Sequence, residues 1–245
     1  MRIESLFTPG EIDESTVKGR TVALIDVLRA CTTAVYAMSG GCERIIPVAT
    51  VEAATNLAAS LDKKVTLLGG EREGKRIDGF DLGNSPLEYT SDVVNKKTII
   101  LATTNGTRTI SMSQGAKEIL IASFVNMRAV VDYASGLDED LLTVICAGQD
   151  DRFALEDAVC AGMLIDRLCK DNDVDLSDGA HAARLLYRQN EQAIPSLLKD
   201  CEHGRYLESL GFGEDLEACA RVDSLRVLPI VKEGRINRAK RPRRK

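Results

Sequence analysis

The sequence predicts an α/β fold, with a largely parallel sheet flanked by helices and a helical C-terminal third. Short apolar runs of strand length alternate with segments of helical composition, as in βαβ units. Polar residues follow four of the runs directly. From residue 171 to about residue 220 the pattern is helical with glycine breaks, and this change is the one compositional seam. We therefore expect residues 1–245 to form a single α/β unit.

The elements follow one another at regular spacing. The first predicted strand covers residues 22–25, and the helix over 30–38 ends at the stop signal Gly40-Gly41. The most regular helix begins at Leu155, because apolar residues recur there every three or four positions up to Cys169. The other predicted strands are 44–49, 65–68, 98–102, 118–122, 141–146 and 225–231, and the other predicted helices are 51–61, a short one after 107, and 126–135.

Composition limits the class of protein. Hydrophobic residues make up 44% and charged residues 28% of the 245 positions, which is typical of soluble globular proteins. The apolar runs are too short to span a membrane and the acidic N-terminus lacks a signal-peptide core, so we expect a cytoplasmic protein without a membrane partner. The segment 238–245 carries six cations and leaves −11 on the rest of the chain. We predict a disordered tail and no nucleic-acid partner, because an acidic body repels a polyanion.

The cysteines and histidines argue against a zinc site or a disulfide framework. Seven cysteines are scattered without a CxxC pair, which favours reduced, buried thiols. The two histidines, His181 and His203, do not stand at metal-ligand spacing. Any metal is therefore expected to be a hard cation held by carboxylates.

Four polar segments follow predicted strands, at 26–29, 70–72, 103–107 and 149–152. In a parallel sheet these segments gather at one edge, where open α/β sheets bind their ligands. The second belongs to a long polar loop, residues 69–86, which we expect to close over a small charged ligand. The segments are rich in carboxylates and arginines, the mixture that a Mg²⁺-dependent enzyme acting on phosphate needs.

Two known phosphatase designs fit less well. Asp26 at a strand end resembles the nucleophile of haloacid-dehalogenase phosphatases, but Leu28 stands where their second aspartate belongs. Cys146 and Arg152 have the C-x₅-R spacing of cysteine phosphatases, although the two acids Asp150 and Asp151 oppose a thiolate nucleophile. A third alternative is a non-catalytic protein that binds small anionic metabolites.

Five motifs in order make a more specific signal than any one alone. They are Ile25-Asp26-Val27-Leu28-Arg29-Ala30, Gly70-Glu71-Arg72, Gly79-Phe80-Asp81-Leu82-Gly83-Asn84-Ser85-Pro86, Thr103-Thr104-Asn105-Gly106-Thr107, and Cys146-Ala147-Gly148 followed by Leu155-Glu156-Asp157. Together they resemble the 2-phosphosulfolactate phosphatase family across roughly residues 20 to 170, and more weakly through His203-Gly204 and residues 223–229.

That resemblance implies a family-specific α/β fold, a cytoplasmic location, a homodimer and a Mg²⁺-dependent phosphatase. The enzyme would hydrolyse 2-phospho-3-sulfolactate to 3-sulfolactate and phosphate, on the route to coenzyme M; a different small phosphorylated hydroxy acid is the alternative substrate. The motifs assign catalytic roles to Asp26, Arg29, Glu71, Arg72, Asn105 and Glu156, substrate binding to Asn84, Ser85, Gly106 and Thr107, and metal binding to Asp26, Glu71, Asp81 and Asp157. Arg29 and Arg72 are expected to contact phosphate or sulfonate oxygens.

Overall fold

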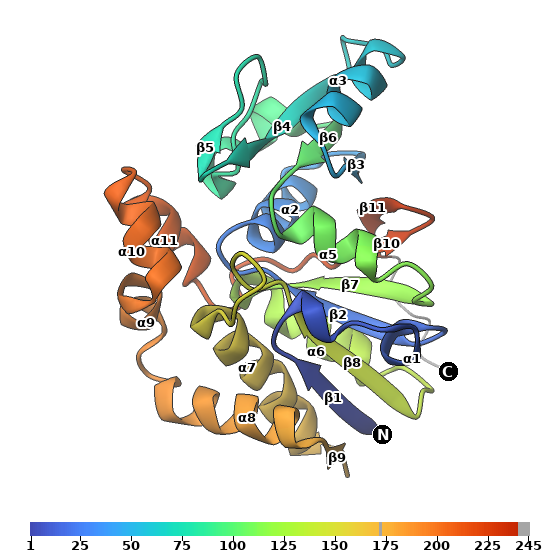
Figure 1. Cartoon of the computed structure of the whole chain (residues 1–245), viewed down its shortest axis with the longest axis vertical. Helices are drawn as coiled ribbons and strands as arrows, with labels where there is room; N and C mark the ends of the chain where they lie inside the picture. Colours follow the sequence, from blue (N-terminus) through green and yellow to red (C-terminus); the bar gives the residue numbers. More distant parts are fainter. Residues whose placement is uncertain (172, 240–245) are drawn as a thin grey trace.

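The computed structural model describes residues 1–171 and 173–239, and these form one mixed sheet of eleven strands with helices on both faces (Figure 1). The strand order is β5-β4-β6-β3-β11-β10-β7-β2-β8-β1-β9. The strands are β1 (Arg2–Leu6), β2 (Thr21–Ile25), β3 (Arg44–Pro47), β4 (Thr66–Arg72), β5 (Lys75–Arg76), β6 (Thr98–Ala102), β7 (Glu118–Ala122), β8 (Leu141–Cys146), β9 (Asp175–Leu176), β10 (Pro229–Lys232) and β11 (Arg235–Arg238).

The helices confirm most of the predicted ones and add several short ones. The α-helices are α1 (Glu14–Val17), α2 (Ala30–Ser39), α3 (Val51–Ala59), α4 (Ser91–Val94), α5 (Gly106–Met112), α6 (Met127–Ala134), α7 (Leu155–Asp171), α8 (Asp178–Asn190), α9 (Ile194–Asp200), α10 (Glu202–Ser209) and α11 (Gly213–Cys219). Three 3₁₀ turns join them: η1 (Pro9–Glu11), η2 (Pro86–Glu88) and η3 (Phe124–Asn126). Within the described residues, no helix combines the length and apolar character of a membrane span.

The sheet contains two parallel blocks joined by an antiparallel hairpin. β4, β6 and β3 pair in parallel, and so do β7, β2, β8 and β1. Between the blocks, the β10–β11 hairpin runs antiparallel to β7 on one side and to β3 on the other. The predicted last strand is thus present, but it begins at Pro229 and pairs antiparallel. The prediction of a largely parallel sheet is confirmed.

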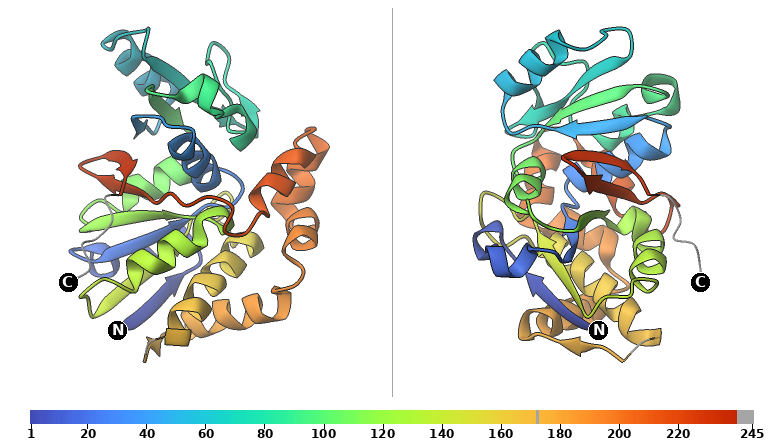
Figure 2. Two further views of the ribbon diagram at one scale, coloured as in Figure 1. Left: turned by 180° about the vertical axis from the view of Figure 1, so that it is seen from behind. Right: turned by 90° about the vertical axis from the view of Figure 1, so that its right-hand side faces the viewer.

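Side chains alternate across the central strands, so each face of this part of the sheet has its own hydrophobic cluster. Figure 2 shows the helices that cover the two faces. Ala23 and Ile25 of β2 pack in the cluster formed with α6, α7 and α8. Val22 and Leu24 lie in the cluster on the opposite face, with α2. All four side chains are fully buried. This burial on both faces explains why β2 reads in the sequence as a continuous apolar run.

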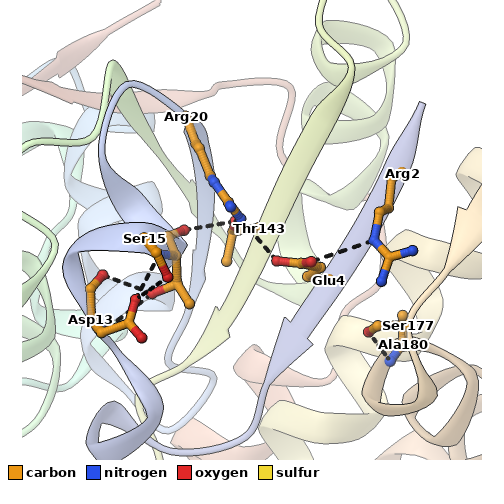
Figure 3. Close-up of polar contacts among 9 residues, drawn as sticks. Arg2, Glu4, Asp13, Ser15, Arg20, Thr143, Ser177 and Ala180 are labelled. Atoms are coloured by element: carbon orange, nitrogen blue, oxygen red, sulfur yellow. Dashed lines mark hydrogen bonds and ion pairs between the residues drawn. The ribbon is translucent and has the colours of Figure 1, made fainter.

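The strand β1 was not predicted, because only alternate residues of it are buried. Ile3 packs in the core, whereas Glu4 faces outward and its Oε2 accepts from Arg20 Nη1 at 2.8 Å (Figure 3). Arg20 Nη1 also donates to Thr143 Oγ1 at 3.4 Å, and Arg2 Nε donates to Glu4 Oε1 at 3.4 Å. These partly exposed contacts join β1 to β8 and to the segment before β2. Their energy is small, so burial of Ile3 is the stronger reason for this strand.

Part of the polar segment 69–86, which was predicted to be a loop, forms two paired strands. β4 continues through Arg72, the turn Glu73-Gly74 has positive φ angles of 51° and 74°, and β5 returns beside β4. The tip of this β4–β5 hairpin reaches the helical arm α9–α11, where Tyr206 Oη donates to the Glu73 carbonyl at 3.0 Å (Figure 1). The hairpin and the arm therefore approach each other above the ends of the central strands.

The predicted basic tail lies almost wholly beyond the part of the chain described. Arg238 ends β11, and Ala239 N donates to the Leu228 carbonyl at 2.8 Å. Residues 240–245 lie outside the described residues.

Candidate functional site

A cavity of about 610 Å³ opens at the carboxyl ends of β2, β4, β6 and β8, with α10 on its far side. All four polar segments that follow these strands contribute to it, so the predicted gathering at one edge is confirmed. The cavity is lined by Asp26, Leu28, Arg29, Ala30, Glu71, Arg72, Glu73, Gly74, Asn84, Thr103, Thr104, Asn105, Gln149, Asp150, His203 and Tyr206.

Asp26 lies directly after β2 and is 5% exposed. Its Oδ1 accepts from Ala30 N at 3.0 Å, so it caps the start of α2. Burial raises the pKa of Asp26 to about 6; the charge of His203 and the bond from Ala30 lower it, and the nearby Glu71 and Glu156 raise it. Gly106 leaves room for this carboxylate, because a Cβ there would come within 2.9 Å of Asp26 Oδ2. The result is a buried carboxyl group that changes charge just below neutral pH.

Glu71, near the end of β4, is held at both carboxylate oxygens. Oε1 accepts from Thr104 N and Thr104 Oγ1, each at 2.9 Å, and Oε2 accepts from Gly74 N at 2.9 Å. The side chain joins the end of β6 to the hairpin turn. Gly70 permits this close approach of β4 to β6, since a Cβ there would lie 2.1 Å from the Ala102 carbonyl oxygen. Glu71 is therefore a rigidly oriented carboxylate on the cavity wall.

Arg29 occupies a buried network rather than a free position. Its Nη1 donates to Asp215 Oδ2 at 2.7 Å, its Nη2 donates to the Gly74 carbonyl at 2.6 Å, and its guanidinium lies 4.3 Å from the ring centroid of Phe212. Ser85 Oγ donates to the other oxygen of Asp215 at 2.6 Å. Arg29 thus links the end of β2, the β4–β5 turn and α11. Ser85, predicted to bind substrate, lies in this network and not on the cavity surface.

Three further predicted residues lie on the cavity. Arg72 Nη1 donates to the Glu71 carbonyl at 2.8 Å and its Nη2 donates to the Ala49 carbonyl at 3.3 Å. Asn105 precedes α5. Asn84 is 5% exposed, and its Oδ1 is buried without a hydrogen-bond partner among the described residues. An unpaired buried oxygen on a cavity wall indicates a missing ligand, such as a cation or a water molecule.

Glu156 and Asp157, in the first turn of α7, have different surroundings. Asp157 Oδ1 accepts from Val27 N at 2.8 Å and its Oδ2 from Gly148 N at 3.1 Å, so both oxygens hold backbone. Burial, with the charges of Glu156 and Asp26, raises the pKa of Asp157 well above its usual value. Glu156 is 2% exposed, and its Oε1 lies 3.6 Å from Nδ1 of His203. The motifs assign no role to His203; its signals in the sequence are that it is one of two histidines and that His203-Gly204 belongs to the weaker part of the family resemblance.

Five other predicted residues are not among those that line the cavity: Asp81, Gly106, Thr107, Glu156 and Asp157. Asp81 is exposed, and its Oδ2 accepts from Leu68 N at 2.8 Å. Thr107 Oγ1 donates to the Thr103 carbonyl at 2.7 Å inside the first turn of α5. Both side chains stabilise the local backbone through these hydrogen bonds.

The cysteine-phosphatase alternative is not supported. Cys146 ends β8 fully buried, and burial raises the pKa of its thiol well above the usual value. A nucleophilic cysteine needs the opposite shift and access to substrate.

The site fits a cation that keeps most of its water ligands. In the parts of the chain that the structure describes, no three His, Cys, Asp or Glu side chains gather into a complete metal cage. Mg²⁺ does not require one, since it commonly binds through one or two carboxylates, with water and substrate phosphate as the other ligands. Glu71 and the unpaired Asn84 Oδ1 are hard oxygen donors of this kind, and both residues line the cavity.

Comparison with known proteins shows which family the chain matches. Residues 6–234 match the family model described as 2-phosphosulpholactate phosphatase. A protein of Clostridium novyi named "Probable 2-phosphosulfolactate phosphatase" is 40% identical over 229 residues, covering 94% of this chain and 96% of its own. A protein of Thermotoga maritima with the same name is 42% identical over 220 residues, covering 90% of this chain and 92% of its own.

Proposed function

This chain belongs to the 2-phosphosulfolactate phosphatase family, and we propose that it hydrolyses 2-phospho-3-sulfolactate to 3-sulfolactate and phosphate with the help of Mg²⁺. The observation that carries the proposal is the cavity itself, where four strand ends bring buried carboxylates and guanidinium groups together. We also propose that the reaction belongs to the route to coenzyme M, as the resemblance implies. A cytoplasmic location and a homodimer stay predictions.

Charge balance supports the metal. The cavity carries four carboxylates, from Asp26, Glu71, Glu73 and Asp150, against Arg72 and His203, because Asp215 already neutralises Arg29. A substrate with phosphate, carboxylate and sulfonate groups would be repelled by this excess of negative charge. A divalent cation held by Glu71 and Asn84 Oδ1 offsets it. When bound, Mg²⁺ stabilises negative charge on the phosphoryl oxygens.

The carboxylates take different roles in this proposal. Glu71 suits the metal, because its hydrogen bonds from Thr104 and Gly74 fix it in one orientation. Asp26 suits proton transfer, because its pKa of about 6 lies close to the working pH of a general base. Asp26 would take a proton from the attacking water, and the guanidinium of Arg72 would contact the anionic oxygens of the substrate.

Phosphate release tests the proposal directly. The purified chain is assayed on 2-phospho-3-sulfolactate with Mg²⁺, then with excess chelator, then after Mg²⁺ is restored. We expect release that the chelator abolishes and Mg²⁺ recovers. Equal rates with and without chelator would contradict the metal requirement.

A matched substrate tests recognition of the sulfonate. 2-Phospholactate has the same ester and carboxylate but no sulfonate, so we expect a lower kcat/KM. An equal kcat/KM would favour another phosphorylated hydroxy acid as the substrate. Tight calorimetric binding of sulfolactate without phosphate release from either ester would instead support the non-catalytic binder.

A further inference from the structure

Hydrolysis of an alkyl phosphate leaves an alkoxide, and an alkoxide is a poor leaving group unless it receives a proton. A side chain that supplies this proton must lie on the cavity and carry a proton that it can release near neutral pH. The roles proposed above leave this step unassigned, since Asp26 accepts a proton from water.

Among the described side chains that line the cavity, the cationic ones are Arg29, Arg72 and His203. Arginine stays protonated in proteins and so does not serve as an acid. Tyr206 already donates its hydroxyl proton to the Glu73 carbonyl at 3.0 Å. Histidine is the side chain that ordinarily exchanges a proton near neutral pH, which singles out His203.

The surroundings of His203 resemble those of an oriented catalytic imidazole. The residue sits near the start of α10, and its side chain is 15% exposed. Nδ1 lies 3.6 Å from Oε1 of Glu156, a separation longer than a hydrogen bond but within ion-pair range. Glu156 is itself buried in the first turn of α7. Because the two ring nitrogens lie on opposite sides of the imidazole, this contact leaves Nε2 for the substrate.

The position relative to Asp26 also fits. Asp26 and His203 both line the cavity, and the charge of His203 opposes the rise that burial causes in the pKa of Asp26. A base for water and an acid for the leaving group must both reach the same phosphorus atom. The end of β2 and the start of α10 place them on the same cavity.

We propose that His203 is the general acid of the reaction, and that Glu156 is a positioning residue that orients its imidazolium. This inference rests on the proposed phosphatase activity. As the water oxygen bonds to phosphorus, Asp26 receives a proton from it. The bond from phosphorus to the ester oxygen breaks, its electron pair stays on that oxygen, and the oxygen takes the Nε2 proton. His203 ends neutral and regains a proton from solvent.

The test uses His203→Gln, whose amide keeps a hydrogen-bond donor but transfers no proton. The matched control is His181→Gln, an exposed histidine on α8. We expect kcat on 2-phospho-3-sulfolactate to fall roughly 100-fold or more in His203→Gln, with little change in KM and none in the control. Circular dichroism and thermal melts establish that each variant is folded.

An isotope effect separates proton donation from a structural role. Substrate labelled with ¹⁸O at the bridging ester oxygen is compared with unlabelled substrate. Without a proton donor, more negative charge develops on that oxygen, so we expect a larger isotope effect on kcat/KM in His203→Gln than in the wild type. Glu156→Gln, which keeps His203, should show a smaller change in the same direction.

Three results decide the outcome. A kcat within about threefold of wild type in folded His203→Gln would overturn this inference alone. An unchanged isotope effect in both His203→Gln and Glu156→Gln would also overturn it, whatever the rates. If the wild-type enzyme releases no phosphate at all, the proposed function fails first and this inference fails with it.

Discussion

Replacing Asp26 with asparagine should make the protein more stable while removing its activity. The buried carboxyl group has its pKa raised from 3.8 to about 6, mainly by burial. Well below pH 3.8 the group is protonated whether the chain is folded or unfolded, so its burial does not lower the free energy of unfolding. As the pH rises, Asp26 ionises first in the unfolded chain. The resulting loss of folding free energy is complete above the folded pKa of about 6. The wild-type protein therefore loses stability from this group between pH 4 and 6.

The magnitude follows from the two pKa values. A tenfold change in ionisation corresponds to about 1.4 kcal/mol, so the ionised Asp26 costs roughly 3 kcal/mol at about pH 8. Asparagine has no charge to bury, and its side-chain oxygen retains the bond from Ala30 N. For a chain of this length, we expect Asp26→Asn to raise Tm by roughly 5–10 °C at about pH 8 and by much less at about pH 4.

The assay is a thermal melt in chelator, so that no metal contributes, at both pH values. Asp138→Asn, at an exposed position in the loop before β8, is the control and should leave Tm nearly unchanged. Phosphate release is measured on the same samples with Mg²⁺ and should fall by roughly 100-fold or more in Asp26→Asn. A Tm at about pH 8 equal to or below that of the wild type would refute the reasoning about burial of charge.

Substitutions of Arg72 and Asp215 test the cavity and the buried network beside it. Arg72→Ala should lower kcat/KM about thirtyfold or more and Arg72→Lys should not restore it fully, because lysine lacks the planar fork; near wild-type activity in folded Arg72→Ala would show that this guanidinium does not contact substrate. Asp215→Ala leaves the buried Arg29 guanidinium unpaired and should destabilise the protein by about 3–5 kcal/mol in urea unfolding. Glu217 lies on α11 like Asp215, and Glu217→Ala, which breaks an exposed pair with Lys199 of α9, should have little effect; equal losses of stability in the two variants would contradict the role of burial.

Much of the fold could be predicted, because burial on both faces produces continuous apolar runs. The runs at residues 22–25 and 98–102 match β2 and β6 closely. The strands that were not predicted have a common cause: the burial that stabilises them comes from distant parts of the chain. β1 has alternate residues buried, with Ile3 in the core, and β11 is four residues long with only Ile236 buried. Such short patterns do not stand out in a sequence.

The candidate site divides in the same way. Asp26, Glu71, Asn84 and Asn105 were predicted from the motifs and lie on the cavity. The motifs did not distinguish them from Asp81, which belongs to the same motif as Asn84 but is exposed. That difference depends on the direction in which the turn after β5 leaves the sheet.

The sequence by itself determined the α/β class, the four polar strand ends and the family, because these depend on local composition and on the order of short motifs. The tertiary structure alone decided the role of each charge. The motifs predict that Arg29 contacts phosphate or sulfonate oxygens. In the structure it pairs with Asp215, 186 positions later, in a buried network. The surroundings of His203 depend on α10, which places this residue on the cavity and beside Glu156. Electrostatic energy depends on distance in space and on burial, and neither is a property of neighbouring letters in a sequence.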